Sequence, residues 1–328
     1  MGNVTIGNPE FFLGRVFELV RNSQEAQKYL FLNTIREIII ADSRCLEDYM
    51  FELTELLMMH TSAESQQIRN IVAEILGRLL ADFPTETFDT VDSGLKSNNE
   101  LQAATTARSI KFAGTRLKDV NTVKFLTNQL VQMCGASNVE VKKNALEALT
   151  SIVHSNWVSM RTHLRDSMSH ILAFALQETK TRPELIHEVD LGPFKHKVDN
   201  GLPMRKAAFG LLETLIEKAY ESIDASSVLV AIITVGLSDS AEECVVLNLN
   251  ILAKMSQNST AVIISYLDQI VAAFNTLFTN NLKLIASSQS QERAINIVRA
   301  LLRVVYLVNK SPEIQEFPSV TFSDFIKN

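Results

Sequence analysis

Residues 204–216 read MRKAAFGLLETLI, and this short segment decides the fold. Apolar residues stand at Met204 and again 3, 4, 7, 8, 11 and 12 positions later, a spacing that places them on one broad face of an α-helix. Residues 68–80, IRNIVAEILGRLL, have apolar residues at identical offsets from Ile68. The same pattern at two distant places in one chain indicates an internal repeat.

The repeat recurs along the chain at a nearly constant spacing. The first inward residues of successive copies fall at 27, 68, 101, 141, 204, 244 and 294, and the copy near 101 has the weakest pattern. Most intervals lie near 40 residues, which is the period of HEAT-type helix pairs. Two intervals are longer, 63 residues from 141 to 204 and 50 residues from 244 to 294. We therefore expect an insertion in the first of them, and a loop over 281–291 in the second.

A second apolar helix precedes most of the marked ones. These partner helices are predicted over 11–20, 45–59, 122–134, 160–176, 226–237 and 262–278, with a turn at 154–156. A helix pair with a wide apolar face buries that face only by stacking on neighbouring pairs. The sequence therefore predicts an all-α, ARM-like superhelical solenoid of HEAT repeats that occupies residues 1–328 as a single domain.

The longest interval contains a β-hairpin signal at residues 185–198, LIHEVDLGPFKHKV. Gly192 and Pro193 suit a two-residue type II′ turn, because glycine accepts the positive φ of the first turn position. The resulting register pairs Leu191 with Phe194, Asp190 with Lys195, Val189 with His196 and Glu188 with Lys197. An isolated hairpin is marginal in water, so this one either packs back on the helices or protrudes to dock a partner.

Composition and motifs exclude several classes of function. A formal net charge of −6 over 328 residues argues against nucleic acid as the main partner. The apolar run at 228–237 is too short to cross a membrane. The three cysteines, Cys45, Cys134 and Cys244, are scattered and fit buried thiols in a reducing compartment.

We find no motif for catalysis, for a metal or for a cofactor. The chain lacks the glycine-rich phosphate loops, the H-E-x-x-H zinc motif and the G-x-S-x-G nucleophile elbow. Its histidines have no acidic or cysteine neighbours at metal-ligand spacing. We therefore expect a protein that is not an enzyme, with no catalytic residues, no metal and no cofactor.

Two runs around the hairpin resemble a known family. Residues 188–196, EVDLGPFKH, and 199–209, DNGLPMRKAAF, are similar to the C-terminal domain of the cullin-associated, neddylation-dissociated proteins, also called the 120-kDa TATA-binding-protein-interacting proteins. Weaker similarity, as in residues 69–74, extends over most of the chain and thins after about Ser238.

The resemblance implies a function. Members of this family are HEAT-repeat proteins that wrap cullin–RING ubiquitin ligase scaffolds lacking the NEDD modification, in the cytoplasm and the nucleus. Their C-terminal arch grips the N-terminal region of the cullin, where a hairpin overlaps the site of the substrate-receptor adaptor. They compete with adaptors and so promote receptor exchange and assembly of SCF ligases, without being ligases themselves. For this chain the resemblance implies the partner-binding residues Glu188, Asp190, Leu191, Gly192, Pro193, Phe194, Lys195, His196 and Lys197.

Length and the first helix point to a further partner. Family members are several times longer, so we expect a C-terminal part or one half of a split protein. The first helix is unusually apolar for the end of a solenoid, with Phe11, Phe12, Leu13 and Phe17. We expect another HEAT segment, fused or separate, to pack there. The alternative function is a generic HEAT scaffold or transport adaptor, which would have no reason to carry the run at residues 192–196.

Overall fold

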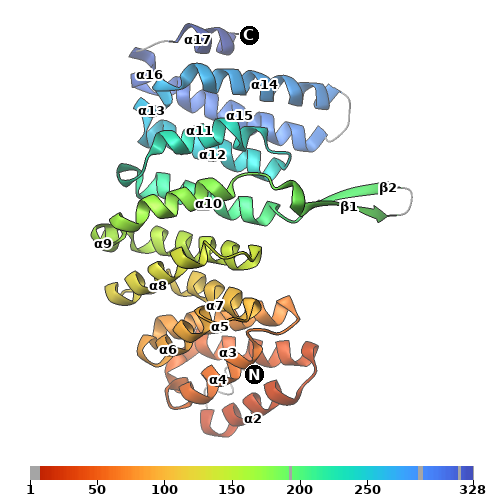
Figure 1. The fold of residues 1–328 in the computed structure, drawn as a ribbon, viewed down its shortest axis with the longest axis vertical. Coiled ribbons are helices and arrows are strands. Elements are labelled where there is room, and N and C mark those ends of the chain that lie inside the picture. Colours follow the sequence, from red (N-terminus) through yellow and green to blue (C-terminus); the bar gives the residue numbers. More distant parts are fainter. Residues whose placement is uncertain (1–7, 192–193, 287–290, 317–318, 328) are drawn as a thin grey trace. The chain divides into compact units, whose positions relative to one another are not determined.

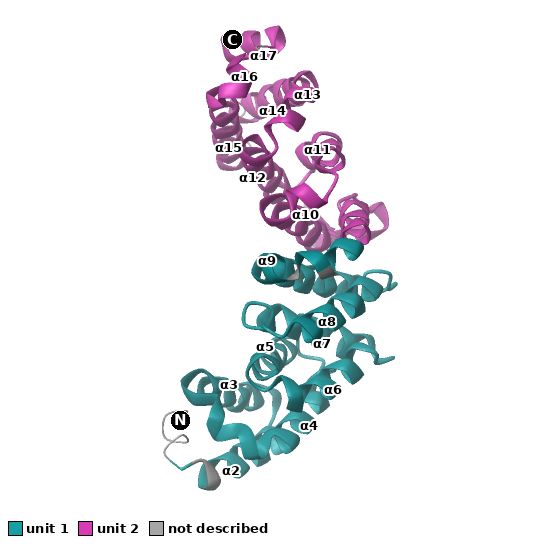
Figure 2. Ribbon diagram, turned by 90° about the vertical axis from the view of Figure 1, so that its left-hand side faces the viewer, with its two compact units in different colours: residues 1–167 teal, residues 168–328 magenta. Residues whose placement is uncertain are grey.

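The computed structural model describes residues 8–191, 194–286, 291–316 and 319–327 of the chain. These residues form helices joined by short turns, with one two-stranded antiparallel sheet (Figure 1). The chain divides into two compact units, residues 1–167 and residues 168–328 (Figure 2). The all-α repeat fold with one inserted hairpin is confirmed. That all 328 residues form a single solenoid domain stays a prediction.

Unit 1 contains successive helix pairs of the predicted repeat. Its elements are α2 (Pro9–Asn22), α3 (Glu25–Asp42), η1 (Ser43–Tyr49), α4 (Met50–His60), α5 (Gln66–Asp82), α6 (Pro84–Leu95), α7 (Glu100–Ala113), α8 (Val120–Met133) and the first part of α9 (Val139–Glu178). The repeat marks at 27, 68, 101 and 141 fall just inside α3, α5, α7 and α9. Helix α3 packs on α5, and α5 packs on α7, so each marked helix contacts the next one.

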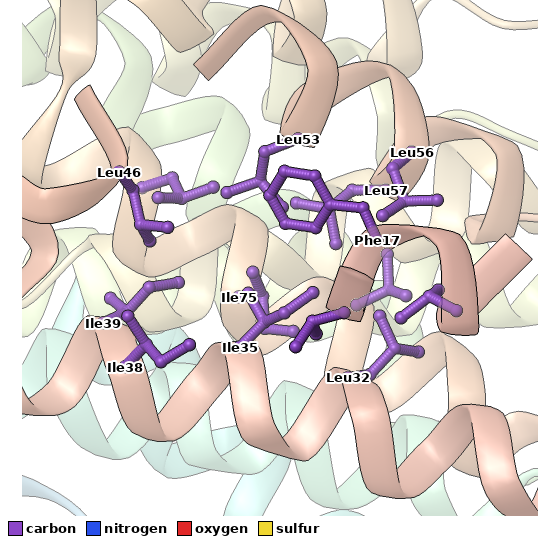
Figure 3. Close-up of a cluster of buried hydrophobic side chains, with 14 of the residues drawn as sticks. Phe17, Leu32, Ile35, Ile38, Ile39, Leu46, Leu53, Leu56, Leu57 and Ile75 are labelled. Carbon is purple, nitrogen blue, oxygen red and sulfur yellow. The ribbon is translucent and has the colours of Figure 1, made fainter. Parts of the chain in front are cut away.

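The start of unit 1 has a dense apolar core (Figure 3). Phe17 from α2 is fully buried among Leu32 and Ile35 of α3 and Leu53 and Leu57 of α4. The four apolar residues of the first helix have different environments: Leu13 and Phe17 are fully buried, Phe12 is half-buried, and 72% of Phe11 is exposed. The apolar character of α2 therefore serves mainly to close the first repeat.

The weak repeat copy near 101 has a physical explanation in the packing of α5 against α7. The buried face of α7 consists mainly of alanine, serine and threonine. A Cβ atom added at Gly77 of α5 would lie 2.1 Å from the backbone oxygen of Ser109 in α7. The two helices approach so closely that only small residues fit between them, and small residues leave a weak hydrophobic pattern in the sequence.

Unit 2 contains the end of α9, the hairpin and the remaining repeats. Its elements are η2 (Pro183–Leu185), β1 (Ile186–Leu191), β2 (Phe194–Asp199), α10 (Leu202–Lys218), η3 (Tyr220–Ser222), α11 (Ala225–Thr234), η4 (Gly236–Ser238), α12 (Glu242–Asn258), α13 (Thr260–Ser265), α14 (Leu267–Ala286), α15 (Gln291–Lys310), α16 (Pro312–Glu316) and α17 (Val320–Lys327). The marks at 204, 244 and 294 fall in α10, α12 and α15, which pack on one another in that order.

Several predicted elements differ from the structure. The helices expected over 45–59 and 262–278 are each divided in two, into η1 and α4 and into α13 and α14. The turn expected at 154–156 is wrong: α9 continues through it, because residues 139–178 contain no glycine or proline. The polar residues there make a tertiary contact instead, since Asn156 donates a hydrogen bond of 2.9 Å to the carbonyl of Gly114. The loop expected over 281–291 is largely wrong, because α14 extends to Ala286; residues 287–290 lie outside the described residues. Helix α6 was not predicted, because its buried side includes Thr87 and Gly94 beside only two large apolar residues.

Candidate partner-binding site

The hairpin has the register that the sequence predicts. Strands β1 and β2 are antiparallel, with the pairs Leu191–Phe194, Asp190–Lys195, Val189–His196, Glu188–Lys197, His187–Val198 and Ile186–Asp199. At the ends far from the turn, β1 begins one residue later than predicted, at Ile186, and β2 ends one residue later than predicted, at Asp199. Figure 1 shows the hairpin leaving unit 2 beside α10 and pointing away from the helices.

Most of the described side chains of the hairpin are exposed, and they lie on both of its faces. His187, Glu188, Asp190, Lys195 and Lys197 are all exposed. Even the apolar Val189 is 38% exposed. Of the two interpretations that the sequence leaves open, the geometry favours the protruding element over a loop packed on the helices.

Part of the predicted site is not described by the structure. Gly192 and Pro193 lie outside the described residues, and so do the side chains of Leu191, Phe194 and His196. The described side chains of the predicted set are Glu188, Asp190, Lys195 and Lys197. Their assignment as partner-binding residues stays a prediction.

The charged side chains of the hairpin form only a weak ion pair with one another. The ion pair that forms is diagonal across the strands, with 3.7 Å between Lys195 Nζ and Glu188 Oε2. Side chains of 71% and 50% exposure at this separation contribute little to stability, because water screens their attraction. The two acidic residues and two lysines of the hairpin therefore lie on a surface that a partner can contact without breaking a strong ion pair.

The base of the hairpin, in contrast, is held firmly. The amide nitrogen of Asn200 donates to the carbonyl of Leu185 at 3.0 Å, which closes the end of the ladder. The carboxylate of Asp199 accepts a hydrogen bond of 2.9 Å from the amide of Gly201. These contacts join the last residues of the hairpin to the turn that begins α10.

A buried arginine then connects this turn to the next repeat. Arg205 of α10 is 1% exposed, and its Nη2 lies 2.9 Å from Asp199 Oδ2. Its Nε and Nη2 donate to the two carboxylate oxygens of Asp239 at 2.8 and 3.1 Å. Asp239 also accepts from the amide of Ala241 at 2.8 Å, just before α12. One guanidinium therefore links the end of β2 to the start of α12, and we call Arg205, Asp199 and Asp239 the base triad.

Arg205 and Asp199 of the base triad are both ionised at neutral pH. Burial acts to raise the pKa of Asp199, but its hydrogen bond with Arg205 and the arginine's charge hold that pKa below the ordinary value. Burial acts to lower the pKa of Arg205, and the hydrogen bonds and charges of both aspartates raise it further than burial lowers it. The triad is therefore a set of charge-assisted contacts rather than a neutral network.

The sequence contains a signal for one member of this triad but none for the other two. A basic residue follows the repeat mark in several copies, as in Arg69 and Arg205. In unit 1, Arg69 donates to the carbonyls of Ala63 and Glu64, both at 2.8 Å, so it holds the turn before its own helix. In unit 2 the same repeat position holds a carboxylate from the hairpin and one from the next repeat. The recurrent basic residue was the signal, but its acidic partners lie 6 positions before it and 34 after it.

The described residues contain neither a metal-binding cluster nor a helix suited to crossing a membrane. Within the described ranges, no group of three or more histidine, cysteine or acidic side chains is placed to hold a metal ion. None of the helices described has both the length and the apolar character that a membrane crossing requires.

The fold and the site together define an α-helical repeat protein of the HEAT and armadillo type that carries a protruding hairpin. A crystal structure of importin beta shares this fold, with a TM-score of 0.67 at 12% identity, over 98% of this chain and 42% of that one. Residues 163–328 match the family model described as "TATA-binding protein interacting (TIP20)". The chain belongs to this TATA-binding-protein-interacting family.

Curated relatives agree with that assignment. Cullin-associated NEDD8-dissociated protein 1 of Dictyostelium discoideum is 28% identical over 100% of this chain and 26% of its own length. A relative from Emericella nidulans named as the C-terminal part of that protein is 24% identical over 95% of this chain and 30% of its own length. The resemblance to the C-terminal domain of this family is confirmed. The chain spans about a quarter of the Dictyostelium relative's length.

Proposed function

We propose that the chain is a non-catalytic regulator of cullin–RING ubiquitin ligases that uses its hairpin to compete with the substrate-receptor adaptor. The observation that carries the proposal is an exposed hairpin whose base is held by the buried Arg205. An element with an exposed surface and a rigid attachment suits competition, because little ordering is needed when it binds. Relatives along the whole chain are named for association with cullins, which supplies the class of partner.

The electrostatics of the chain support a non-catalytic role. Among the residues that the structure describes, three groups have strongly shifted pKa values, and each shift has a structural cause. Arg205 belongs to the base triad, and hydrogen bonds from Lys218 and Lys254 lower the pKa of Glu217 to about 2. Burial raises the pKa of the Cys244 thiol to about 12, so this cysteine is a poor nucleophile. These groups hold helices together rather than facing a substrate.

The proposed mechanism is displacement at a shared surface. The chain binds the N-terminal region of a cullin that lacks the NEDD8 modification, and the hairpin occupies space that the adaptor also needs. Adaptor and chain then exclude each other, so successive binding and release exchange one substrate receptor for another and assemble new SCF complexes. The chain would act where cullin–RING ligases act, in the cytoplasm and the nucleus. A separate N-terminal HEAT half would add further contacts to the same cullin.

Adaptor displacement from an unmodified cullin–RING complex tests the proposal. The adaptor and the cullin are labelled as a fluorescence-transfer pair, and release is followed as the intact chain is added. Two variants are compared: residues 188–198 replaced by a Gly-Ser linker, and the double change Lys195→Glu with Lys197→Glu. Lys96→Glu is the control, because Lys96 is an exposed lysine in unit 1, outside the hairpin, and its ion pair with Asp92 is a local one at the end of α6.

We expect the intact chain and Lys96→Glu to displace the adaptor. The hairpin deletion should still bind cullin but lose most of the displacement, since the helical repeats retain their own contacts. If the deletion displaces the adaptor as well as the intact chain, the hairpin is not the competing element. If the intact chain does not bind cullin, the proposal is wrong, and a general HEAT scaffold or transport adaptor is the alternative to test next.

A further inference from the structure

A polar groove crosses consecutive marked helices of unit 1. It has a volume of about 620 Å³ and is lined by residues of α3, α5, α7 and α9, among them Tyr29, Arg36, Asn70, Arg108, Lys111 and Phe112. None of these residues belongs to the hairpin or to the base triad, which lie in unit 2. The groove is therefore a second surface of the chain, and its function is a separate question.

Two of the cations in the groove are matched by carboxylates. Arg36 lies 2.6 Å from Glu37 and 3.6 Å from Glu74. Lys111 lies 2.9 Å from Glu147, which joins α7 to α9. These pairs neutralise the two flanks of the groove.

Arg108, between those flanks, has only neutral partners among the residues that the structure describes. Its guanidinium donates to the amide oxygen of Asn70 on α5, and to that of Asn144 on α9 at 3.2 Å. Asn144 is itself fixed, because it is 1% exposed and its Nδ2 donates to the carbonyl of Ala104 at 2.8 Å. Two amides thus hold the guanidinium in place without neutralising its charge.

A second cation, Lys143, directly precedes Asn144, the residue of α9 that accepts a hydrogen bond from Arg108. Lys143 is half-buried on α9, and within the described ranges it has no carboxylate at ion-pair distance. Burial makes the largest contribution to lowering the pKa of Lys143, and the charge of Arg108 lowers it further, while the charges of Glu147 and Glu140 offset part of this effect. The nearest acids on its own helix are engaged elsewhere, Glu147 with Lys111 and Glu140 with Arg69. Among the residues that the structure describes, neither Arg108 nor Lys143 therefore has a carboxylate of its own at ion-pair distance.

We propose that this groove binds an extended acidic segment of a protein partner. A carboxylate of the segment would pair with Arg108, which lines the groove and has only neutral partners there. Lys143 is not part of the lining, and it would add positive charge from α9 beside Asn144. Apolar side chains on either side would contact Tyr29 and Phe112, the aromatic residues of the lining. Asn70 is exposed, and its free amide hydrogens can donate to a peptide carbonyl.

The dimensions and the remaining charges restrict the ligand to a peptide. Packed helices lie roughly 8–10 Å apart, so crossing from α3 to α9 takes about 24–30 Å. An extended peptide covers that distance with about seven to nine residues at ~3.3 Å each. A nucleic acid would bring a phosphate to every position and would meet the carboxylates of Glu74 and Glu147 in the same groove.

Fluorescence anisotropy with a labelled nonapeptide of alternating glutamate and phenylalanine tests the proposal. The protein is the full chain, compared with Arg108→Gln, Lys143→Gln and the surface control Lys96→Gln. The probes for comparison are the same peptide with glutamine in place of glutamate, and a nine-nucleotide oligothymidine. Thermal melting of each variant confirms that the fold is intact.

We expect the acidic peptide to bind the chain and Lys96→Gln equally. Arg108→Gln and Lys143→Gln should each weaken binding of the acidic peptide about tenfold, which corresponds to roughly 1.4 kcal/mol. Replacement of glutamate by glutamine in the peptide should have a similar effect. Equal binding to all four proteins, or no binding below millimolar peptide, would overturn the proposal. Tighter binding of the oligothymidine would also overturn it, since the site would then be one for polyanions. None of these results depends on the hairpin, so the two proposals fail or stand separately.

Discussion

The base triad allows a quantitative prediction for Arg205→Met. Methionine keeps much of the length and the apolar stem of the arginine but removes its charge. Asp239, whose side chain is fully buried, would then have no cation, and neither would Asp199. Removal of one partner from a buried ion pair costs roughly 3–5 kcal/mol, mostly because the remaining charge stays desolvated. The variant should therefore be much less stable than the parent, although the change adds no bulk.

The expected effect on thermal unfolding follows from the size of the unit. For a domain of this size each 1 kcal/mol shifts the melting temperature by about 2–4 °C. The transition of unit 2 should therefore fall by roughly 6–20 °C, which calorimetry measures directly. The neighbouring change Lys206→Met is the control, because its ion pair with Glu243 is exposed on both sides and contributes about 0–1 kcal/mol.

A variant that restores stability, and the pH dependence of unfolding, complete the test. Adding Asp199→Asn and Asp239→Asn to Arg205→Met removes the uncompensated charges and should recover part of the lost stability. Because the pKa of Asp199 is lowered in the folded state, its stabilising contribution is present above the ordinary value of 3.8 and is lost as the pH falls through the lower folded value. The gap between parent and Arg205→Met should narrow in that range. A melting temperature within about 2 °C of the parent at neutral pH would refute the reasoning.

Three further predictions concern other parts of the chain. Leu76, Leu149 and Leu212 are fully buried at equivalent repeat positions, and alanine at each should lower the free energy of unfolding by roughly 2–5 kcal/mol, as measured in urea. Losses below about half a kcal/mol at all three would contradict the repeat register. Ellman's reagent should modify the half-buried Cys45 fastest in the folded protein, whereas equal reaction of Cys244 would contradict its burial. Lys254→Met should raise the pKa of Glu217 from about 2 part of the way to its ordinary 4.5, because Lys218 remains as a partner; an unchanged value by NMR titration would contradict the assigned cause.

The repeat helices could be predicted because their burial leaves a periodic trace. Residues 68–80 and 204–216 each pack a wide apolar face, so their offsets in the sequence reproduce the helical period. The hairpin register could be predicted for a similar reason, since a two-residue turn determines every pair that follows it. Both features depend on residues close together in the chain, and local patterns are what a single sequence shows best.

The parts that were missed depend on residues far apart. The acidic partners of Arg205 come from a hairpin and from a different repeat, and no local pattern joins Asp199 to Asp239. The groove around Arg108 also arises only when α5, α7 and α9 pack together. Helix α6 was missed because it buries few large apolar residues, and the continuity of α9 because polar residues in its middle serve a tertiary hydrogen bond.

The central claim, that the hairpin occupies the adaptor's site on a cullin, is tested most directly by site-specific photo-crosslinking. A photoreactive amino acid replaces Lys195, which is exposed and makes only a weak ion pair, and the chain is illuminated with an unmodified cullin–RING complex. The same replacement at Lys96 in unit 1 serves as the reference. We expect a crosslink from position 195 to the N-terminal region of the cullin, and we expect it to disappear when the adaptor is bound first. A crosslink that persists beside the bound adaptor, or its absence while the chain is bound to cullin, would contradict the claim.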